Sequence, residues 1–435
     1  MIRNIISTTI TRFLAALISL AIVILNSRNI GPEGVGMIGI IILDITIIAN
    51  ISGFFGGSSF VYFASKKSLK NLSILSLFSS IIGPILFYTL YILLQNFEQI
   101  SNVVAPKEFV YHIIMISVLL LLYTNNLSMI LGKEKIIIQN ILTVVQSVSL
   151  ILSLSYFFYF SHDYSVLAYV KSYYLSIIIP LVLSFIFLLR MIINDNKQED
   201  FNFSYLKEIF DYGFKVQMAS LLQIFNYRMS YYFLKAFFPN GNRLGIYTVG
   251  NQISEGLWII GKSVAMVQYS RISNTEDDEI NSKLTLSLLK FSVIVTGFLL
   301  LLLILLPVEF YVFIFHYQAF AEVKIVVLFL SPGIISLVAN MIFSHYLSGI
   351  GRPSFNIISS FFGLVAICIS GYFLIPQWGI TGAAGSASIT YFISMLISMF
   401  FYFSVSKSKI SDLKLKRSDY ILFYEVIKTI IGKKK

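Results

Sequence analysis

The chain has 435 residues, of which 57% are hydrophobic and only 12% are charged, and its formal net charge is +11. Soluble proteins carry about 25% charged residues, so this composition argues against a soluble protein. Apolar runs of about 20 residues, the length that crosses a bilayer as a helix, recur from end to end. We therefore predict a polytopic all-α membrane protein, because a β-barrel would show short alternating segments instead.

Twelve hydrophobic segments are expected in chain order. The first follows a basic start, but it is too long for a signal peptide and lacks a small-x-small exit, so we interpret it as an uncleaved helix. The longest internal connection, 190–208, contains the polar run NDNKQED and predicts a seam between two six-helix lobes, 1–200 and 201–405, followed by a basic cytoplasmic tail, 406–435. The segments are 8–27, 36–62, 72–95, 108–131, 137–160, 165–189, 209–237, 244–270, 284–306, 323–348, 354–375 and 382–404.

Lysine and arginine are distributed unevenly between the two sets of loops. One set together with the C-terminal tail holds 21 of the 32, the other set holds 3, and the remaining 8 lie within or at the edges of the segments. Because cytoplasmic loops are enriched in Lys and Arg, both termini are predicted to be cytoplasmic. The net charge thus reflects membrane orientation, and no nucleic-acid partner is expected.

Two pairs of loop sequences suggest an internal repeat. GPEGVGMIGI resembles NGNRLGIYTV about 209 residues later, and LGKEKIIIQNIL resembles SGIGRPSFNIIS about 218 residues later. This predicts two parallel six-helix repeats with a substrate site between them. Helices 1, 2, 7 and 8 would then be equivalent.

Ionised side chains lie well inside these four helices. A charge at the bilayer centre costs at least about 2.5–3.5 kcal/mol, so such residues seldom face lipid. Gln223 and Asn251 lie on polar stripes of helices 7 and 8. The alternative is that the polar residues only bridge packed helices. We expect the charged residues to meet at the interface of the halves: Arg12, Asp44, Arg228, Glu255 and Lys262.

Residue constellations typical of catalysis are absent from the sequence. The four histidines are scattered without metal-ligand spacing, there is no Walker-type phosphate loop, and no long loop exists on the outer side. We therefore expect that the protein is not an enzyme and binds no metal or cofactor.

Several stretches carry a family resemblance: RNIGPEGVGMIGI, LGIYTVGNQISEGLW, SGIGRPSFN, IPQWGITGAAGSASITY and SLLQIFNYRMSYYFLKAFF. They resemble the Wzx-type polysaccharide-biosynthesis flippases of the multidrug/oligosaccharidyl-lipid/polysaccharide (MOP) exporter superfamily. One departure is that many members carry an acidic residue just after the position of Arg228, where this chain has Met229 and Ser230. The resemblance implies a twelve-helix, two-lobed, MATE-like fold in the bacterial cytoplasmic (inner) membrane.

The resemblance also implies a substrate, an undecaprenyl-diphosphate-linked oligosaccharide such as an O-antigen or capsule repeat unit, moved to the outer leaflet by alternating access. Polysaccharide polymerases and glycosyltransferases of the same pathway are expected partners, besides membrane lipids. In this interpretation Arg12, Arg228 and Lys262 hold the diphosphate, because Arg offers two-pronged oxygen contacts.

Gln223 and Asn251 would bind sugar hydroxyls, and Asp44 or Glu255 would couple transport to H+ or Na+. The alternative within the fold is a cation-coupled drug antiporter, which would favour an acidic cavity. A membrane polysaccharide polymerase is the other alternative, and it would show a long outer loop.

Overall fold

The computed structural model describes residues 2–97, 103–195, 197, 203–272 and 277–415. Within these ranges the chain forms helices joined by short turns, and no strand occurs. The α-helices are α1 (Ile2–Ser52), α2 (Ser58–Ala64), α3 (Leu69–Leu94), α5 (Val110–Gly132), α6 (Ile136–Tyr159), α7 (Val166–Ile193), α8 (Phe203–Phe237), α9 (Asn242–Ile272), α10 (Asp278–Leu305), α11 (Val308–Phe315), α12 (Val323–Gly349) and α13 (Ser354–Val405). The 3-10 helices are η1 (Gly53–Phe55), η2 (Lys107–Phe109), η3 (Gln318–Glu322) and η4 (Ile410–Leu413).

The helix α13 contains two of the predicted segments. The helix α1 contains the first predicted segment and residues 36–52 of the second, 36–62, which continues through η1 into α2. Gly31 interrupts α1 with φ 81° and ψ 176°, and Gly379 interrupts α13 with φ 56° and ψ −124°. Glycine tolerates positive φ because it lacks a Cβ, and Pro32 supplies a φ suited to the first turn of the next arm. With the eight other long helices, these arms account for all twelve predicted segments in the described part of the chain.

The helices α8 and α9 differ from the others in polarity. Eight helices among the described residues are long and apolar enough to cross a membrane. This count takes each kinked helix once. Neither α8 nor α9 is among the eight. Both exceed the ~20 residues that a crossing requires, with 35 and 31 residues. Their polar and charged side chains, rather than their length, set them apart.

The chain forms two compact units that are interleaved in sequence. Unit 1 contains residues 1–224, 231–249 and 312–320, and unit 2 contains 225–230, 250–311 and 321–435. The predicted lobes, 1–200 and 201–405, follow a different division, and their boundary stays a prediction. Of the predicted tail, 406–435, only residues up to 415 are described.

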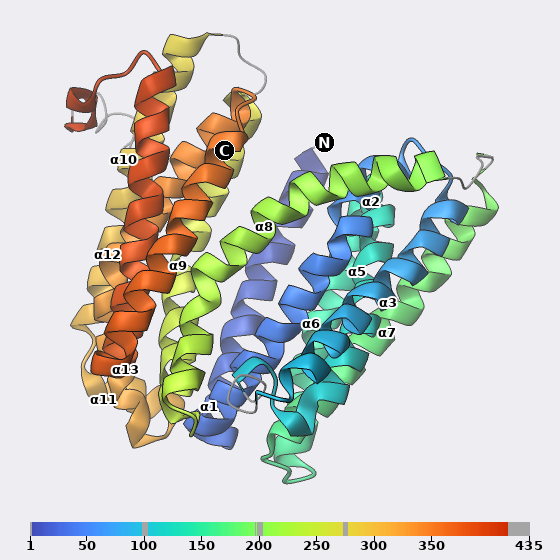
Figure 1. The fold of residues 1–435 in the computed structure, drawn as a ribbon, viewed down its shortest axis with the longest axis horizontal. Coiled ribbons are helices and arrows are strands. Elements are labelled where there is room, and N and C mark those ends of the chain that lie inside the picture. Colours follow the sequence, from blue (N-terminus) through green and yellow to red (C-terminus); the bar gives the residue numbers. More distant parts are fainter. Residues whose placement is uncertain (1, 98–102, 196, 198–202, 273–276, 416–435) are drawn as a thin grey trace, which may run out of the picture. The chain divides into compact units, whose positions relative to one another are not determined.

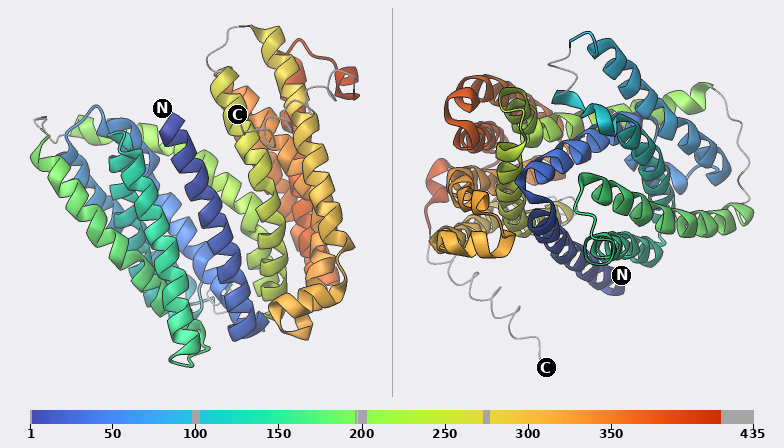
Figure 2. Two further views of the ribbon diagram at one scale, coloured as in Figure 1. Left: turned by 180° about the vertical axis from the view of Figure 1, so that it is seen from behind. Right: turned by 90° about the horizontal axis from the view of Figure 1, so that it is seen from below.

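In unit 1, α3, α5, α6 and α7 pack around α1 (Figures 1 and 2). Ile41, Ile45 and Ile48 recur at helical spacing on the second arm of α1 and are at most 1% exposed. They contact a core that α3, α5 and α7 share. Because lipid tails are as apolar as these side chains, close packing rather than the hydrophobic effect holds such helices together.

The basic loops of unit 1 lie together at one end. Lys67 pairs with Glu208 at 2.7 Å, Lys133 pairs with Asp195 at 3.2 Å, and Lys197 donates a hydrogen bond to the Ser65 carbonyl. The loops after α2, α5 and α7 are thus joined to one another and to the first turns of α8 by ion pairs and a hydrogen bond. Their common end agrees with the predicted set of positive loops, while the side of the membrane stays a prediction.

In unit 2, α10 and α13 pack against α12, and these helices run side by side (Figures 1 and 2). Glycine allows α9 to approach α12 closely: a Cβ built on Gly250 would lie 2.6 Å from Val326, and one on Gly261 would lie 2.8 Å from Val338. The two arms of α13 are linked by the Ser359 hydroxyl, which donates to the Ser394 carbonyl at 2.7 Å. Small residues at the contacts are typical of membrane helix packing.

A second close approach lies in unit 1, between the start of the second arm of α1 and the start of α9. A Cβ on Gly245 would lie 1.7 Å from the carbonyl oxygen of Pro32, and one on Gly36 would lie 2.5 Å from that of Gly241. Because the obstacles are backbone atoms, no side chain can rotate to make room. Glycine is therefore required on both sides of this crossing.

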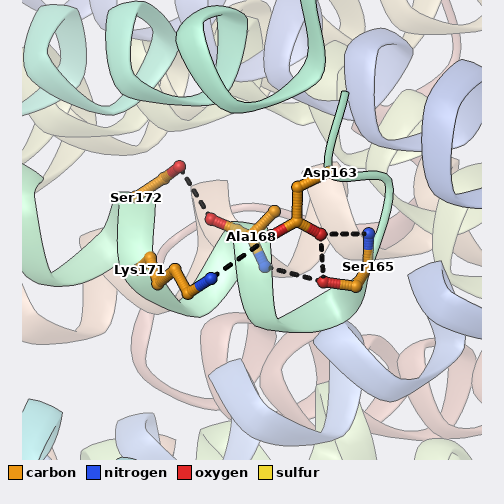
Figure 3. A network of polar contacts seen from close by, with 5 residues as sticks. All are labelled: Asp163, Ser165, Ala168, Lys171 and Ser172. Carbon is orange, nitrogen blue, oxygen red and sulfur yellow. Dashed lines mark hydrogen bonds and ion pairs between the residues drawn. The ribbon is translucent and has the colours of Figure 1, made fainter. Parts of the chain in front are cut away.

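The turn between α6 and α7 contains a network of polar contacts (Figure 3). Asp163 accepts hydrogen bonds from the hydroxyl of Ser165 at 2.6 Å and from its backbone N–H at 3.2 Å, and it pairs with Lys171 at 3.3 Å. Ser165 caps α7 by accepting from the Ala168 N–H at 3.2 Å. The Ser165 hydroxyl, and secondarily Lys171, lower the pKa of the Asp163 carboxyl below its usual range.

The Gly245 crossing predicts a stability difference between two glycines of one helix. We expect Gly245→Ala to lower the free energy of unfolding by about 1–3 kcal/mol, because the helix starts must separate. The matched control is Gly256→Ala on α9, where a Cβ would meet nothing within 4 Å, so stability should be unchanged or slightly raised. Thermal unfolding in detergent measures both, and equal midpoints would contradict the close approach.

The Asp163 network predicts a pH-dependent contribution to stability. Since the folded-state pKa is lowered, the contribution is present above the unfolded pKa of about 3.9 and is lost as pH falls through the folded value. Asp163→Asn should therefore unfold at a lower temperature than wild type at pH 7, with the difference shrinking toward pH 3. A difference that grows on acidification would contradict this assignment.

Candidate substrate site

An ion pair joins the two polar helices within unit 2. Nη2 of Arg228 on α8 lies 2.7 Å from Oε2 of Glu255 on α9. The other oxygen, Oε1, accepts a hydrogen bond at 2.9 Å from Nδ2 of Asn251, one turn earlier on α9. Both carboxylate oxygens of Glu255 thus have donors, and three residues predicted as site residues come together.

The pair is partly accessible. The Arg228 side chain is 27% exposed and that of Glu255 is 13% exposed. Neither charge is isolated in an apolar environment, where it would be costly, and the exposed part of the Arg228 side chain is accessible to an anionic ligand. Arg228 can therefore contact a ligand while Glu255 balances its charge.

Aromatic side chains adjoin the ion pair. Tyr227, next to Arg228 in the chain, lies with its ring centroid 5.1 Å from that of Trp258 and 5.6 Å from that of Tyr391 on α13. Trp258 is half-buried, whereas Tyr391 is 1% exposed. Such rings combine flat apolar faces with polar edges, a surface that suits a sugar ring.

A second polar group lies in unit 1. Asp44, on the second arm of α1, is 0% exposed and accepts a hydrogen bond from the Tyr232 hydroxyl of α8 at 2.7 Å. Its other oxygen, Oδ2, is buried and has no hydrogen-bond partner among the described residues. Asp44 differs from Glu255 in having a hydroxyl, not a cation, as its partner.

The remaining predicted site residues lie on α1, α8 and α9. Lys262 is exposed on α9, and Gln223 is exposed on α8. The side chain of Arg12 lies outside the described part of the structure, although its backbone belongs to α1. Convergence of all five charges therefore stays a prediction, as do the individual roles of these residues.

Tyr232 is the residue that sequence reasoning missed. The polar stripe predicted on this helix was represented by Gln223, and Tyr232, which contacts Asp44, was not among the predicted site residues. Tyr232 lies four residues after Arg228, so it occupies the same side of α8 as the arginine. A stripe drawn through Arg228 rather than beside it would have included Tyr232.

Among the described residues, no group of three His, Cys, Asp or Glu side chains could hold a metal ion. His345 is engaged with the Met341 carbonyl at 2.8 Å, and His112 with the Tyr174 hydroxyl at 3.2 Å. The candidate groups are therefore the ion pair with its aromatic rings in unit 2 and the buried acid in unit 1.

Comparison with protein families gives one match. A profile of the family described as "Polysaccharide biosynthesis protein" matches residues 1–257. No curated sequence matches the chain at a significant level.

Solved structures with a similar fold are membrane transport proteins. The lipid II flippase MurJ, in an inward closed conformation, has a TM-score of 0.73 and 17% identity, covering 99% of this chain and 93% of that one. An inward-facing MATE family multidrug resistance transporter of the MOP superfamily gives 0.68 and 15%, covering 92% and 97%. A Pyrococcus furiosus MOP superfamily transporter, described as having a binding pocket of reversed polarity, gives 0.59 and 14%, covering 95% and 96%.

These similarities cover nearly the whole chain and confirm the predicted fold class, an all-α membrane protein of twelve transmembrane helices. The prediction that the chain is not an enzyme agrees with the match to a flippase and transporters. The predicted cytoplasmic location of both termini remains a prediction.

The ion pair predicts coupling between two substitutions. Arg228→Gln would leave the Glu255 carboxylate without its cation, and Glu255→Gln would leave the guanidinium without its anion, so each should destabilise the protein. The double variant should recover part of the loss, with a coupling energy of about 1–3 kcal/mol in denaturant unfolding. Additive effects would show that the pair contributes nothing to stability.

Proposed function

Because the chain belongs to the polysaccharide biosynthesis protein family, whose profile matches residues 1–257, we propose that it is a flippase for a lipid-linked oligosaccharide. The substrate is an undecaprenyl-diphosphate-linked repeat unit, such as an O-antigen or capsule unit, and it moves from the cytoplasmic to the outer leaflet by alternating access. A fold similar to that of a lipid II flippase supports this proposal.

The observation that carries the proposal is the partly exposed Arg228–Glu255 pair. A diphosphate entering from the headgroup region brings negative charge into surroundings that exclude water. The Arg228 guanidinium can bind two of its oxygens side by side. When the site is empty, Glu255 neutralises the arginine, so neither state leaves an isolated cation at membrane depth.

The aromatic rings beside this pair supply the sugar contacts. Tyr227 and Trp258 present ring faces to the apolar side of a sugar, and Tyr hydroxyls and Gln223 can bind sugar hydroxyl groups. Asn251 acts mainly through Glu255, which it already contacts. Arg12 and Lys262 are proposed as additional cations for the diphosphate.

Location and partners follow from this substrate. The protein acts in the bacterial cytoplasmic membrane, between the glycosyltransferases that build the lipid-linked unit and the polymerase that consumes it. Transport is coupled to an ion, H+ or Na+, through a buried carboxylate. Lipid tails stay in the bilayer while the headgroup crosses.

A transport assay with reconstituted protein tests the proposal. Vesicles containing undecaprenyl-diphosphate-linked oligosaccharide are assayed for glycan that becomes accessible to a lectin in the opposite leaflet. Wild type should flip the lipid, whereas Arg228→Gln should reduce the rate at least 10-fold, because loss of a charged hydrogen bond costs about 1.5–3 kcal/mol or more.

Arg352→Gln provides the matched control, since Arg352 is an exposed arginine far along the chain from the pair. It should flip the lipid at the wild-type rate. A fluorescent organic cation tested in the same vesicles addresses the antiporter alternative. Cation transport without lipid flipping, or full flipping by Arg228→Gln, would overturn the proposal.

A further inference from the structure

The two carboxylates predicted to couple transport have different environments. Glu255 is balanced by Arg228 at 2.7 Å and held by Asn251 at 2.9 Å. Asp44 is fully buried, has a hydroxyl as its hydrogen-bond partner, and presents a buried oxygen without a partner among the described residues. An ionised group is therefore stabilised in the first case and not in the second.

The cations on α8 nearest to this contact are engaged elsewhere. Arg228, one turn before Tyr232, pairs with Glu255, and Lys235, about one turn after it, donates to the Pro239 carbonyl at 2.8 Å. Arg243 of α9 stacks on Phe238 with its guanidinium carbon 3.9 Å from the ring centroid. None of these side chains pairs with Asp44.

The other helices packed against α1 bring no partner either. The sequence of α6 contains no charged residue. Glu33, on α1 itself, precedes Asp44 by eleven residues, or about 16 Å of helix. The basic side chains on α3, α5 and α7 are Lys70, His112, Lys171 and Arg190. None of the ion pairs among the described residues joins one of these side chains, or any other, to Asp44.

A carboxylate buried without a cation or several donors is strongly disfavoured, and binding a proton removes the charge. We propose that the Asp44 carboxyl, linked to Tyr232, is the proton-binding site of the transport cycle. This inference rests on the proposed function, and it assigns coupling to H+ and to Asp44 rather than to Glu255. One proton binds to the carboxylate from water and is released to water.

The position of the contact explains how the proton acts on conformation. Tyr232 of α8 and Asp44 of α1 are joined by one hydrogen bond, and the Asp44 side chain is fully buried. Loss of the proton leaves a charge that needs hydration, so the ionised form favours a conformation in which this contact opens. By linkage, a conformation that opens the contact releases the proton.

Sodium fits this site poorly. A hard cation such as Ca2+ or Mg2+ takes six or more oxygen ligands, and Na+ likewise requires several. Among the described residues, the hydrogen-bond partner of the Asp44 carboxylate is the Tyr232 hydroxyl, which donates its hydrogen. A proton needs only the carboxylate.

Infrared difference spectroscopy of the full-length protein tests proton binding directly. Wild type titrated between acidic and alkaline pH should show the carbonyl band of a buried protonated carboxyl, and Asp44→Asn should lack it. Glu255→Gln is the matched control and should keep the band. Persistence of the band in Asp44→Asn, or its loss in Glu255→Gln alone, would overturn the assignment.

The flipping assay supplies the second measurement. A proton gradient across the vesicles should shift the final distribution of lipid between the leaflets about 10-fold per pH unit for one proton per lipid, and Asp44→Asn should lose this response. Accumulation driven by a sodium gradient at equal pH would contradict the inference. If wild type flips no lipid under either gradient, the proposed function fails, and the infrared band still decides whether Asp44 binds the proton.

Discussion

The cost of placing charge in an apolar environment is the constraint on which this structure depends. Outside α8 and α9, the long helices present apolar surfaces, and their polar side chains mostly satisfy their own backbone, as the Ser172 hydroxyl does by donating to the Ala168 carbonyl (Figure 3). The ionised groups at membrane depth in α8 and α9 require partners instead. Arg228 and Glu255 meet this requirement by pairing with each other, and Asn251 donates a hydrogen bond to the second carboxylate oxygen of Glu255.

The same constraint separates two kinds of chemistry. A paired arginine that stays partly exposed can contact phosphate oxygens, which its planar guanidinium binds in a two-pronged manner. A buried acid with only a hydroxyl beside it responds to protons instead, because its ionised form has nothing to balance it. In the proposed cycle the substrate would be bound by Arg228 in unit 2, and the proton would be bound by Asp44 in unit 1.

Glycine and proline shape the helices that carry these groups. Gly31 and Pro32 divide α1 into two arms, and the second arm carries Asp44. In the same unit, Arg28 donates to the carbonyls of Phe313 and Ile314 at the end of α11, and a Cβ on Gly31 would lie 3.3 Å from the Tyr317 ring. The kink is thus held by a segment almost 300 residues away in the chain.

The sequence by itself determined the membrane class, the twelve helical segments and the unusual polarity of α8 and α9, because these depend on local composition and on helical periodicity. It also identified Arg228, Glu255 and Asn251 as polar groups at membrane depth. Only the tertiary structure decided which of them are partners: Glu255 binds Arg228 on another helix, not Lys262 two turns along its own. The Tyr232 contact to Asp44 likewise depends on how α8 packs on α1. The two residues are 188 positions apart in the chain, and no local sequence pattern specifies a contact between residues so far apart.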